Sequence, residues 1–122
     1  MYAIEVTTEF CAAHQLRLPD GGTEPLHGHN WRVTVRVESN QLDPLETVMD
    51  FHILEKLLHE IVNPWVNQTL NAIPPFNQSI NPSAERLAET IAHAIRDQIR
   101  PPARLVEVRI TEAPGCLAVY KP

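Results

Sequence analysis

Residues 24–38 read EPLHGHNWRVTVRVE, a stretch that combines a strong structural pattern with a pair of potential metal ligands. From Trp31 to Val37, apolar side chains alternate with polar ones, which predicts a strand buried on one face. His27 and His29 have the same parity as the apolar residues, so we expect both imidazoles on the buried face. Side chains two residues apart in a strand point to the same side, and the pair can therefore bind a single cation.

The preceding segment supplies a third imidazole. Residues 4–10 alternate in the same way, and His14 keeps the parity of Phe10, so a neighbouring strand can carry it to the histidine pair. Three imidazoles that leave a fourth position open are typical of catalytic zinc sites, where that position holds water or a substrate oxygen. His14, His27 and His29 are therefore the predicted ligands of a catalytic zinc ion.

Two other interpretations of these histidines are open at the level of sequence. Cys11 lies three residues before His14, and its sulfur together with three imidazoles would make a closed structural site. That arrangement requires a bulge, because residues three apart in a strand point to opposite faces. In the other interpretation, the histidines are ordinary polar residues at a strand end and bind no metal.

The composition excludes several classes of protein. The chain of 122 residues is expected to form a single domain over residues 1–122, with one core. A net charge of −5 without a basic run argues against nucleic acid or an anionic membrane as partner. No apolar run approaches the ~20 residues of a membrane span, and no signal peptide is recognisable. The two cysteines are interpreted as reduced thiols, so we expect a cytoplasmic protein.

Two helices are predicted in the middle of the chain. Asp50 is expected to cap the first, over residues 51–62, in which leucines recur at helical spacing. Asn81 is expected to cap the second, which should run to the Pro101–Pro102 pair. Residues 63–80 have no consistent period and predict a long structured loop, which in a compact domain is usually functional.

The C-terminal part returns to strand patterning. Val106, Val108 and Ile110 alternate with polar residues, and after a turn residues 116–120 form a plausible hairpin partner. The element order is therefore strand, strand, helix, helix, strand, strand. This order predicts an α+β fold with a four-stranded antiparallel sheet and both helices on one face.

Two glutamates are candidates for chemistry. Glu112 continues the parity of Ile110, so its carboxylate either faces the apolar side of the sheet or lies in solvent beyond the strand. A buried carboxylate needs compensation, which a ligand with adjacent N–H donors, such as a pterin or guanine, would supply. Glu24 precedes His27 by three residues and is either a base beside a metal-bound hydroxyl or a solvated loop residue.

Several motifs of the chain resemble those of the 6-pyruvoyl-tetrahydropterin synthase and 6-carboxy-tetrahydropterin synthase family. They occur in family order over essentially the whole chain: Phe10–His14, Leu26–Trp31, Val48–Phe51, Asn81–Glu85 and Thr111–Glu112. The resemblance implies a tunnelling fold (T-fold), in which hairpins of three subunits close a barrel and two trimers form a homohexamer.

The resemblance also implies a ligand set. Zn²⁺ would be bound by the three histidines, and a pterin would be held by Glu112 and Thr111 with help from Ser83. The substrate class would be 7,8-dihydroneopterin triphosphate.

The chain departs from the usual family pattern at three positions. The cysteine that normally stands four residues before the histidine pair is replaced by Thr23, and the usual Asp-His pair falls at Val66 and Asn67. Glu24 remains, and the chain resembles a subgroup in which glutamate replaces the cysteine. Members of that subgroup cleave the side chain in a retro-aldol manner and release 6-hydroxymethyl-7,8-dihydropterin for folate synthesis. Two alternatives are a 6-carboxy-5,6,7,8-tetrahydropterin synthase of queuosine biosynthesis and a zinc-containing pterin-binding protein without catalysis.

Overall fold

Two long strands pair along their whole length and form the largest part of the sheet. In the computed structural model, which describes residues 1–122, β1 (Tyr2–His14) is antiparallel to β2 (His27–Ser39), with Tyr2 opposite Ser39 and His14 opposite His27. The sheet continues through β3 (Arg104–Ala113) to β4 (Cys116–Tyr120), and all neighbouring strands are antiparallel.

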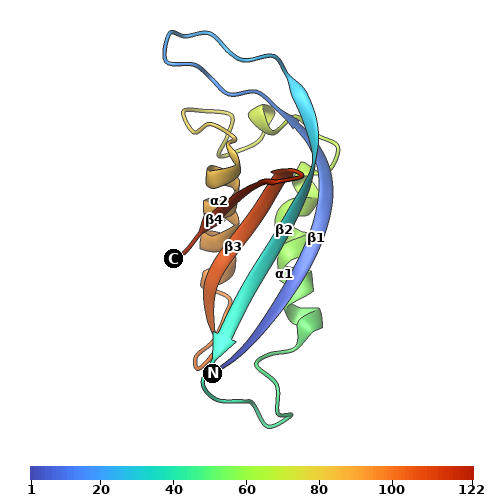
Figure 1. Cartoon of the computed structure of the whole chain (residues 1–122), viewed down its shortest axis with the longest axis vertical. Coiled ribbons are helices and arrows are strands. Elements are labelled where there is room, and N and C mark those ends of the chain that lie inside the picture. The colour runs from blue at the N-terminus through green and yellow to red at the C-terminus, as the bar shows by residue number, and fades with distance from the viewer.

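Two helices cover one face of this sheet, as Figure 1 shows. The helices are α1 (Phe51–Val62) and α2 (Ala84–Arg96), and the segment between them contains two short 3-10 helices, η1 (Asn63–Trp65) and η2 (Leu70–Ala72). The predicted α+β fold, with four antiparallel strands and two helices on one face, is confirmed. Neither helix has the length and apolar character needed to cross a membrane.

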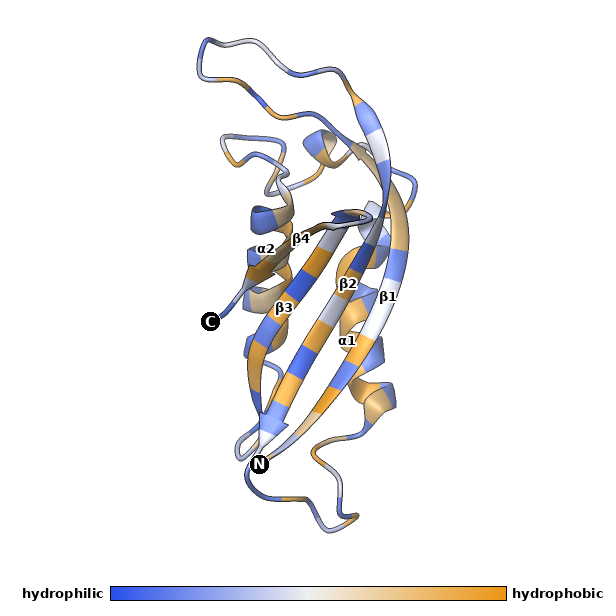
Figure 2. Ribbon diagram, in the orientation of Figure 1, coloured by the Kyte–Doolittle hydropathy of each residue, from blue (hydrophilic) through white to orange (hydrophobic).

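The core lies between the sheet and the helices. Trp31, Val33, Val35 and Val37 are fully buried, and the strand colouring in Figure 2 alternates accordingly. Burying a valine side chain contributes about 1.5–3 kcal/mol relative to exposure, so this single strand is a major source of stability. Helix α2 packs its apolar stripe, which includes Leu87 and Ile91, into the same core.

The opposite face of the sheet is polar. Side chains that lie directly opposite each other on β1 and β2 pair across the strands, as in Glu9–Arg32 (2.7 Å) and Thr7–Thr34 (2.9 Å). Such exposed pairs contribute little stability, but they keep this face hydrated. The alternation therefore directs the histidines toward the helix side of the sheet.

The β3 strand differs from the prediction because it contains a bulge. Val37 lies opposite Leu105 and Arg36 opposite Glu107, so Val106 is an extra residue on β3. Beyond a bulge the side chains change faces, and Leu105 is buried in place of the expected Val106. From Val108 onward the predicted parity holds.

The boundaries of α2 also differ from the prediction. Ser83, not Asn81, is the N-cap, and its hydroxyl accepts a hydrogen bond from the Arg86 N–H at 3.2 Å. The Asn81 side chain is instead bound to the backbone of Arg17.

The C-terminal end of α2 differs as well. The helix ends at Arg96, earlier than expected, because the chain unwinds into turns that keep the next apolar residue, Ile99, almost completely buried. The Asp50 cap of α1 is confirmed, with its carboxylate bound to the His52 N–H.

Candidate metal centre

The three predicted histidines meet at one end of the sheet. His14 and His27 end β1 and begin β2 directly opposite each other, and His29 lies opposite Ala12. The ring centroids of the three imidazoles are 4.7–5.1 Å apart. The predicted convergence of His14, His27 and His29 is therefore present in the structure, and it follows from the shared parity of two antiparallel strands.

Backbone carbonyls fix the orientation of two of these rings. His14 Nδ1 donates a hydrogen bond to the Pro82 carbonyl at 2.7 Å, and His27 Nδ1 donates one to the Pro25 carbonyl at 2.8 Å. Because a carbonyl can only accept, each neutral ring has its proton on Nδ1 and a lone pair on Nε2. This is the arrangement that prepares a histidine to bind a metal through Nε2.

A fourth donor reaches the histidines from β3. Thr111 lies opposite Leu117 and Ala113 opposite Cys116, so Glu112 is an extra residue at a second bulge. Its Oε1 lies 3.0 Å from His14 Nε2 and 3.2 Å from His29 Nε2. Ligand atoms of His14, His27, His29 and Glu112 all lie within 4.8 Å of one another. Glu112 was predicted as a substrate contact, and the structure places its carboxylate beside the imidazoles.

These residues fit a divalent metal ion. His14 Nε2 and His29 Nε2 are buried and have no hydrogen-bond partner, because the nearby Glu112 oxygen lacks hydrogen-bond geometry to them. Buried polar atoms without partners are rare and costly, and a cation would satisfy both. Burial also lowers the pKa of His29, against the opposing effect of the Glu112 charge. The neutral form, which is the metal-binding form, is thereby favoured.

The closed site with a sulfur ligand is ruled out by the geometry. Cys11 is exposed and lies opposite Asn30, on the face of the sheet that points away from the histidines. It does not belong to the cluster of donor atoms. The strand has no bulge near Cys11, and so the three-residue spacing from His14 keeps the sulfur on the wrong face.

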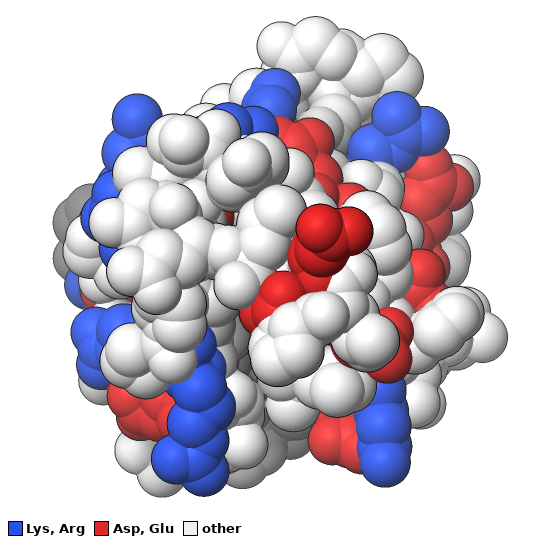
Figure 3. Space-filling model, turned by 90° about the horizontal axis from the view of Figure 1, so that it is seen from below, with Lys and Arg blue, Asp and Glu red and all other residues white.

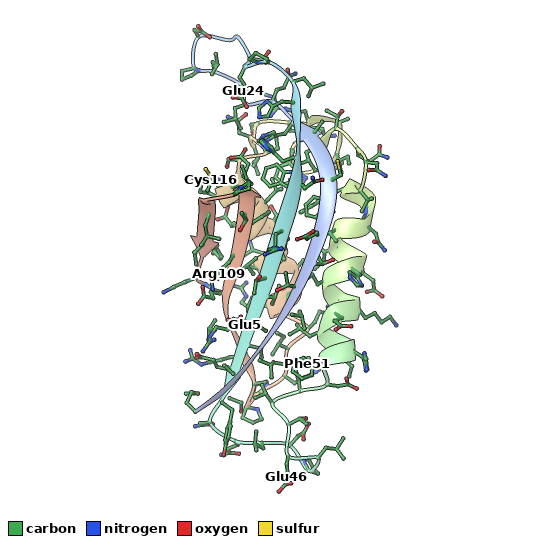
Figure 4. The ribbon with its side chains drawn as sticks, turned by 45° about the vertical axis from the view of Figure 1, so that its right-hand side comes forward. Glu5, Glu24, Glu46, Phe51, Arg109 and Cys116 are labelled. Atoms are coloured by element: carbon green, nitrogen blue, oxygen red, sulfur yellow. The ribbon has the colours of Figure 1, made fainter.

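Glu24 lies in the loop that joins β1 to β2, at the metal end of the molecule (Figure 4). Its backbone N–H donates to the Leu16 carbonyl and its Oε1 accepts from the Leu16 N–H, both at 3.0 Å. Its charge acts on His29, although its carboxylate is not among the clustered donors. Glu24 is therefore half-buried and held in place beside the metal centre, not free in solvent.

The segment that carries Glu24's partner, Leu16, is bound by two asparagines: Asn71, which no sequence pattern singled out, and Asn81, which was predicted to be a helix cap. Asn71 pairs its amide with both backbone groups of Gln15, at 2.9 and 2.7 Å. Asn81 does the same with Arg17, at 2.7 and 3.1 Å. Residues 15–17 thus have all their backbone groups paired. No local pattern reveals such pairing, since it joins residues more than fifty positions apart.

A small pocket lies beside Glu112. It has a volume of about 200 Å³, and its walls are formed by the start of α2 and by the β3–β4 hairpin: Ala84, Glu85, Glu112, Cys116, Leu117 and Ala118. Glu85 is an acidic residue in the first turn of α2. It has no ion-pair partner and shares the pocket with Glu112, so it is a second carboxylate available to a ligand.

The other two predicted substrate contacts are placed differently. Ser83 is next to this pocket in sequence, and its hydroxyl is engaged as the α2 cap. Thr111 lines a separate cleft of about 320 Å³ on the polar face of the sheet, with Asn30 and Arg32. The structure therefore does not bring the Thr111 side chain to the histidines.

The largest cavity lies at the opposite end of the molecule. It has a volume of about 670 Å³ and is lined by residues 41–45, 48–50, 53 and 98–103, none of which is a histidine or cysteine. Figure 3 views this end and shows acidic and basic side chains scattered over it, not gathered into one charged patch. The cluster of potential metal ligands lies at the other end.

Comparisons with known proteins agree with this arrangement. The family model described as 6-pyruvoyl tetrahydropterin synthase matches residues 3–122. The 6-carboxy-5,6,7,8-tetrahydropterin synthase of Bacillus subtilis (strain 168) is 28% identical over 130 residues, covering 99% of this chain and 87% of the relative.

Two solved structures share the fold. The Caenorhabditis elegans 6-pyruvoyl tetrahydropterin synthase has a TM-score of 0.84 and 21% identity, covering 99% of this chain and 95% of the other. A Plasmodium vivax 6-pyruvoyltetrahydropterin synthase in which a catalytic glutamate is replaced by alanine has a TM-score of 0.74 and 19% identity, covering 100% and 99%. The family model covers nearly the entire chain, and the protein therefore belongs to the 6-pyruvoyl tetrahydropterin synthase family.

Proposed function

We propose that this protein is a zinc-dependent lyase that acts on the side chain of 7,8-dihydroneopterin triphosphate. The reaction is a retro-aldol cleavage that yields 6-hydroxymethyl-7,8-dihydropterin. The observation that carries the proposal is the combination of three converging imidazoles with Glu24, which is fixed in the adjoining loop by the Leu16 N–H.

Zinc is the metal that suits these donors best. Imidazole nitrogens favour zinc and other transition metals, whereas Mg²⁺ and Ca²⁺ favour sites made only of oxygen ligands. When bound, zinc acts as a Lewis acid that makes side-chain hydroxyls of the substrate more acidic. His14 and His27 would hold it through Nε2, because their Nδ1 atoms are bound to backbone carbonyls.

Glu24 is the proposed base. It removes the proton from a side-chain hydroxyl, a new carbonyl forms, and the neighbouring carbon–carbon bond breaks. The electron pair of that bond passes toward the pterin ring, and the carbon beside the ring then takes up a proton. Thr23, Val66 and Asn67 offer no base for this step. The catalytic glutamate of the Plasmodium vivax protein supports a glutamate in this role.

The pterin ring is proposed to bind in the small pocket beside Glu112. Glu112 and Glu85 line it, and a carboxylate there can accept the adjacent N–H groups of the ring. Ser83 contributes by starting α2 at the pocket, and Thr111 by its backbone pairing with Leu117, which precedes the bulge at Glu112.

We further propose that the protein is a cytoplasmic homohexamer built from two trimers, as the family resemblance implies. In the single chain, β1 and β4 are the two edges of the sheet. Apart from Cys11 and Ala13, whose backbone groups bond to Asn67 and Gln68, their outer backbone groups are available to neighbouring subunits. Light scattering of the purified protein tests this directly, since a monomeric or dimeric mass would contradict it.

A second candidate function is supported by the Bacillus subtilis relative. That protein is a 6-carboxy-5,6,7,8-tetrahydropterin synthase, an activity that would place this chain in queuosine biosynthesis. A third is a zinc-containing pterin-binding protein without turnover, which the residues at Thr23, Val66 and Asn67 would suit.

One experiment separates these functions. Purified zinc-loaded protein is incubated with 7,8-dihydroneopterin triphosphate, and the products are identified by mass spectrometry. We expect 6-hydroxymethyl-7,8-dihydropterin from the wild type and from Thr23→Ala, and a rate at least about 100-fold lower from Glu24→Gln. The 6-carboxy product would support the second function, and tight pterin binding without any product would support the third. Full turnover by Glu24→Gln would remove Glu24 from its role.

A further inference from the structure

We propose that Glu112 is the fourth metal ligand in the substrate-free protein and that it yields this position when a substrate enters. The inference concerns the same metal centre as the proposed function. It changes the metal coordination expected without substrate, however: the metal would have four protein ligands instead of three protein ligands and one open position.

The first support is the distance between donor atoms. In a tetrahedral zinc site with ligand bonds of about 2.0–2.2 Å, neighbouring donor atoms are separated by about 3.3–3.5 Å. The Glu112 oxygen lies 3.0 Å from His14 Nε2 and 3.2 Å from His29 Nε2. These separations are close to the edges of one coordination tetrahedron.

The second support is the position of the ring protons. His14 Nδ1 donates to the Pro82 carbonyl, so the Nε2 of the neutral ring faces the Glu112 oxygen with a lone pair. Two lone pairs at this distance repel each other unless a cation lies between them. Neither His14 Nε2 nor His29 Nε2 makes a hydrogen bond that would explain the approach. A shared metal ion accounts for both contacts at once.

The third support is that the backbone directs Glu112 to this place. Glu112 is the extra residue of the bulge between Thr111 and Ala113, and bulges of this kind redirect a side chain. Unlike His14, which is 2% exposed, the Glu112 side chain is 32% exposed and also lines the small pocket with Glu85. Among the four clustered donor residues, Glu112 is therefore the one that borders the pocket, and its carboxylate can move into that open space.

The consequence is a site that resists small competing ligands until a substrate occupies the pocket. A substrate that binds beside Glu85 and draws Glu112 toward its own N–H groups would open the fourth position. Azide or acetate lacks those groups and would have to displace the carboxylate without compensation.

Cobalt spectroscopy tests this without any turnover. The metal-free protein is loaded with Co²⁺, and its visible absorption is followed during titration with azide. We expect Glu112→Ala to show an altered cobalt spectrum and to bind azide at a concentration at least about tenfold lower than the wild type needs. Glu85→Ala, which lines the same pocket without touching the histidines, should behave like the wild type. Added acetate should return the Glu112→Ala spectrum toward that of the wild type.

A second variant guards against a folding defect. Glu112→Gln keeps the size of the side chain, and we expect its zinc dissociation constant, measured by chelator competition, to rise at least about tenfold. The proposal is overturned if Glu112→Ala has the wild-type cobalt spectrum and azide midpoint, or if Glu112→Gln binds zinc as tightly as the wild type. Because neither measurement uses a pterin, its outcome is independent of which reaction the protein catalyses.

Discussion

The side-chain amide of Asn81 makes two hydrogen bonds with the backbone of Arg17, of the kind that a neighbouring strand would make. Its oxygen accepts the Arg17 N–H at 2.7 Å and its nitrogen donates to the Arg17 carbonyl at 3.1 Å. The next residue, Pro82, carries the carbonyl that orients His14. One side chain therefore connects the loop that holds Glu24 to the loop that orients a predicted metal ligand.

We expect Asn81→Ala to lower both stability and metal affinity. Loss of two partly buried hydrogen bonds should reduce the free energy of unfolding by about 2 kcal/mol, as measured by urea denaturation. Because Pro82 is then less firmly held, the zinc dissociation constant should rise as well. Asn77→Ala is the matched control, since Asn77 is exposed in the same loop and no hydrogen bond of its side chain is present. Equal zinc affinity in the two variants would disprove the connection to His14.

Ser83→Ala should destabilise the protein through α2. The Ser83 hydroxyl accepts from the Arg86 N–H, and loss of such a cap typically costs about 1 kcal/mol. Thermal unfolding followed by circular dichroism measures this effect. A conservative Ser83→Thr change should retain most of the stability, and if Ser83→Ala has none of the expected effect, the cap is not made in solution.

Metal removal should lower the thermal stability of the protein. Zinc at a hundredfold excess over its dissociation constant stabilises the folded state by about 2.7 kcal/mol, which corresponds to a Tm shift of roughly 10 °C for a domain of this size. A chelator should therefore lower the Tm of the wild type but leave that of His27→Ala unchanged. His52→Ala is the control, because His52 is exposed on α1 and should respond to the chelator as the wild type does.

The loop after β2 should show a defined acid dependence. A hydrogen bond from the Thr47 hydroxyl, followed by those from the Thr47 and Leu45 N–H groups, lowers the pKa of Asp43. The stabilisation is therefore complete above the ordinary aspartate pKa of about 3.9 and is lost as the pH falls through the lower folded value. In Thr47→Val the Asp43 pKa, followed by NMR titration, should rise toward the ordinary value, whereas Thr23→Val should leave it unchanged.

Much of the fold could be predicted from periodicity. The alternation in β1 and β2 identified the buried face, and the spacing of His27 and His29 placed both on it. The prediction failed at Val106, because a bulge changes parity without a local signal. It failed at Asn81 for a different reason: an asparagine before a proline suits a helix cap, and its bonds to Arg17 depend on a segment far away in sequence.

The candidate site was predictable to a similar extent. The three histidines follow from strand parity alone, whereas the position of Glu112 depends on a second bulge. Asn71, like Asn81, acts through tertiary pairing and was therefore missed. The sequence places Glu85 at the start of the second predicted helix, but its place in a pocket depends on how α2 packs against β4.

The four donors of the metal centre are unevenly distributed along the chain. All three imidazoles fall within residues 14–29, on a hairpin whose strands pair with each other directly, whereas the carboxylate belongs to residue 112. During synthesis on the ribosome, the nitrogen donors therefore emerge long before the oxygen donor. If the cluster binds a metal as proposed, the three imidazoles of the first hairpin are available to the ion first, and the final strands then complete the donor set.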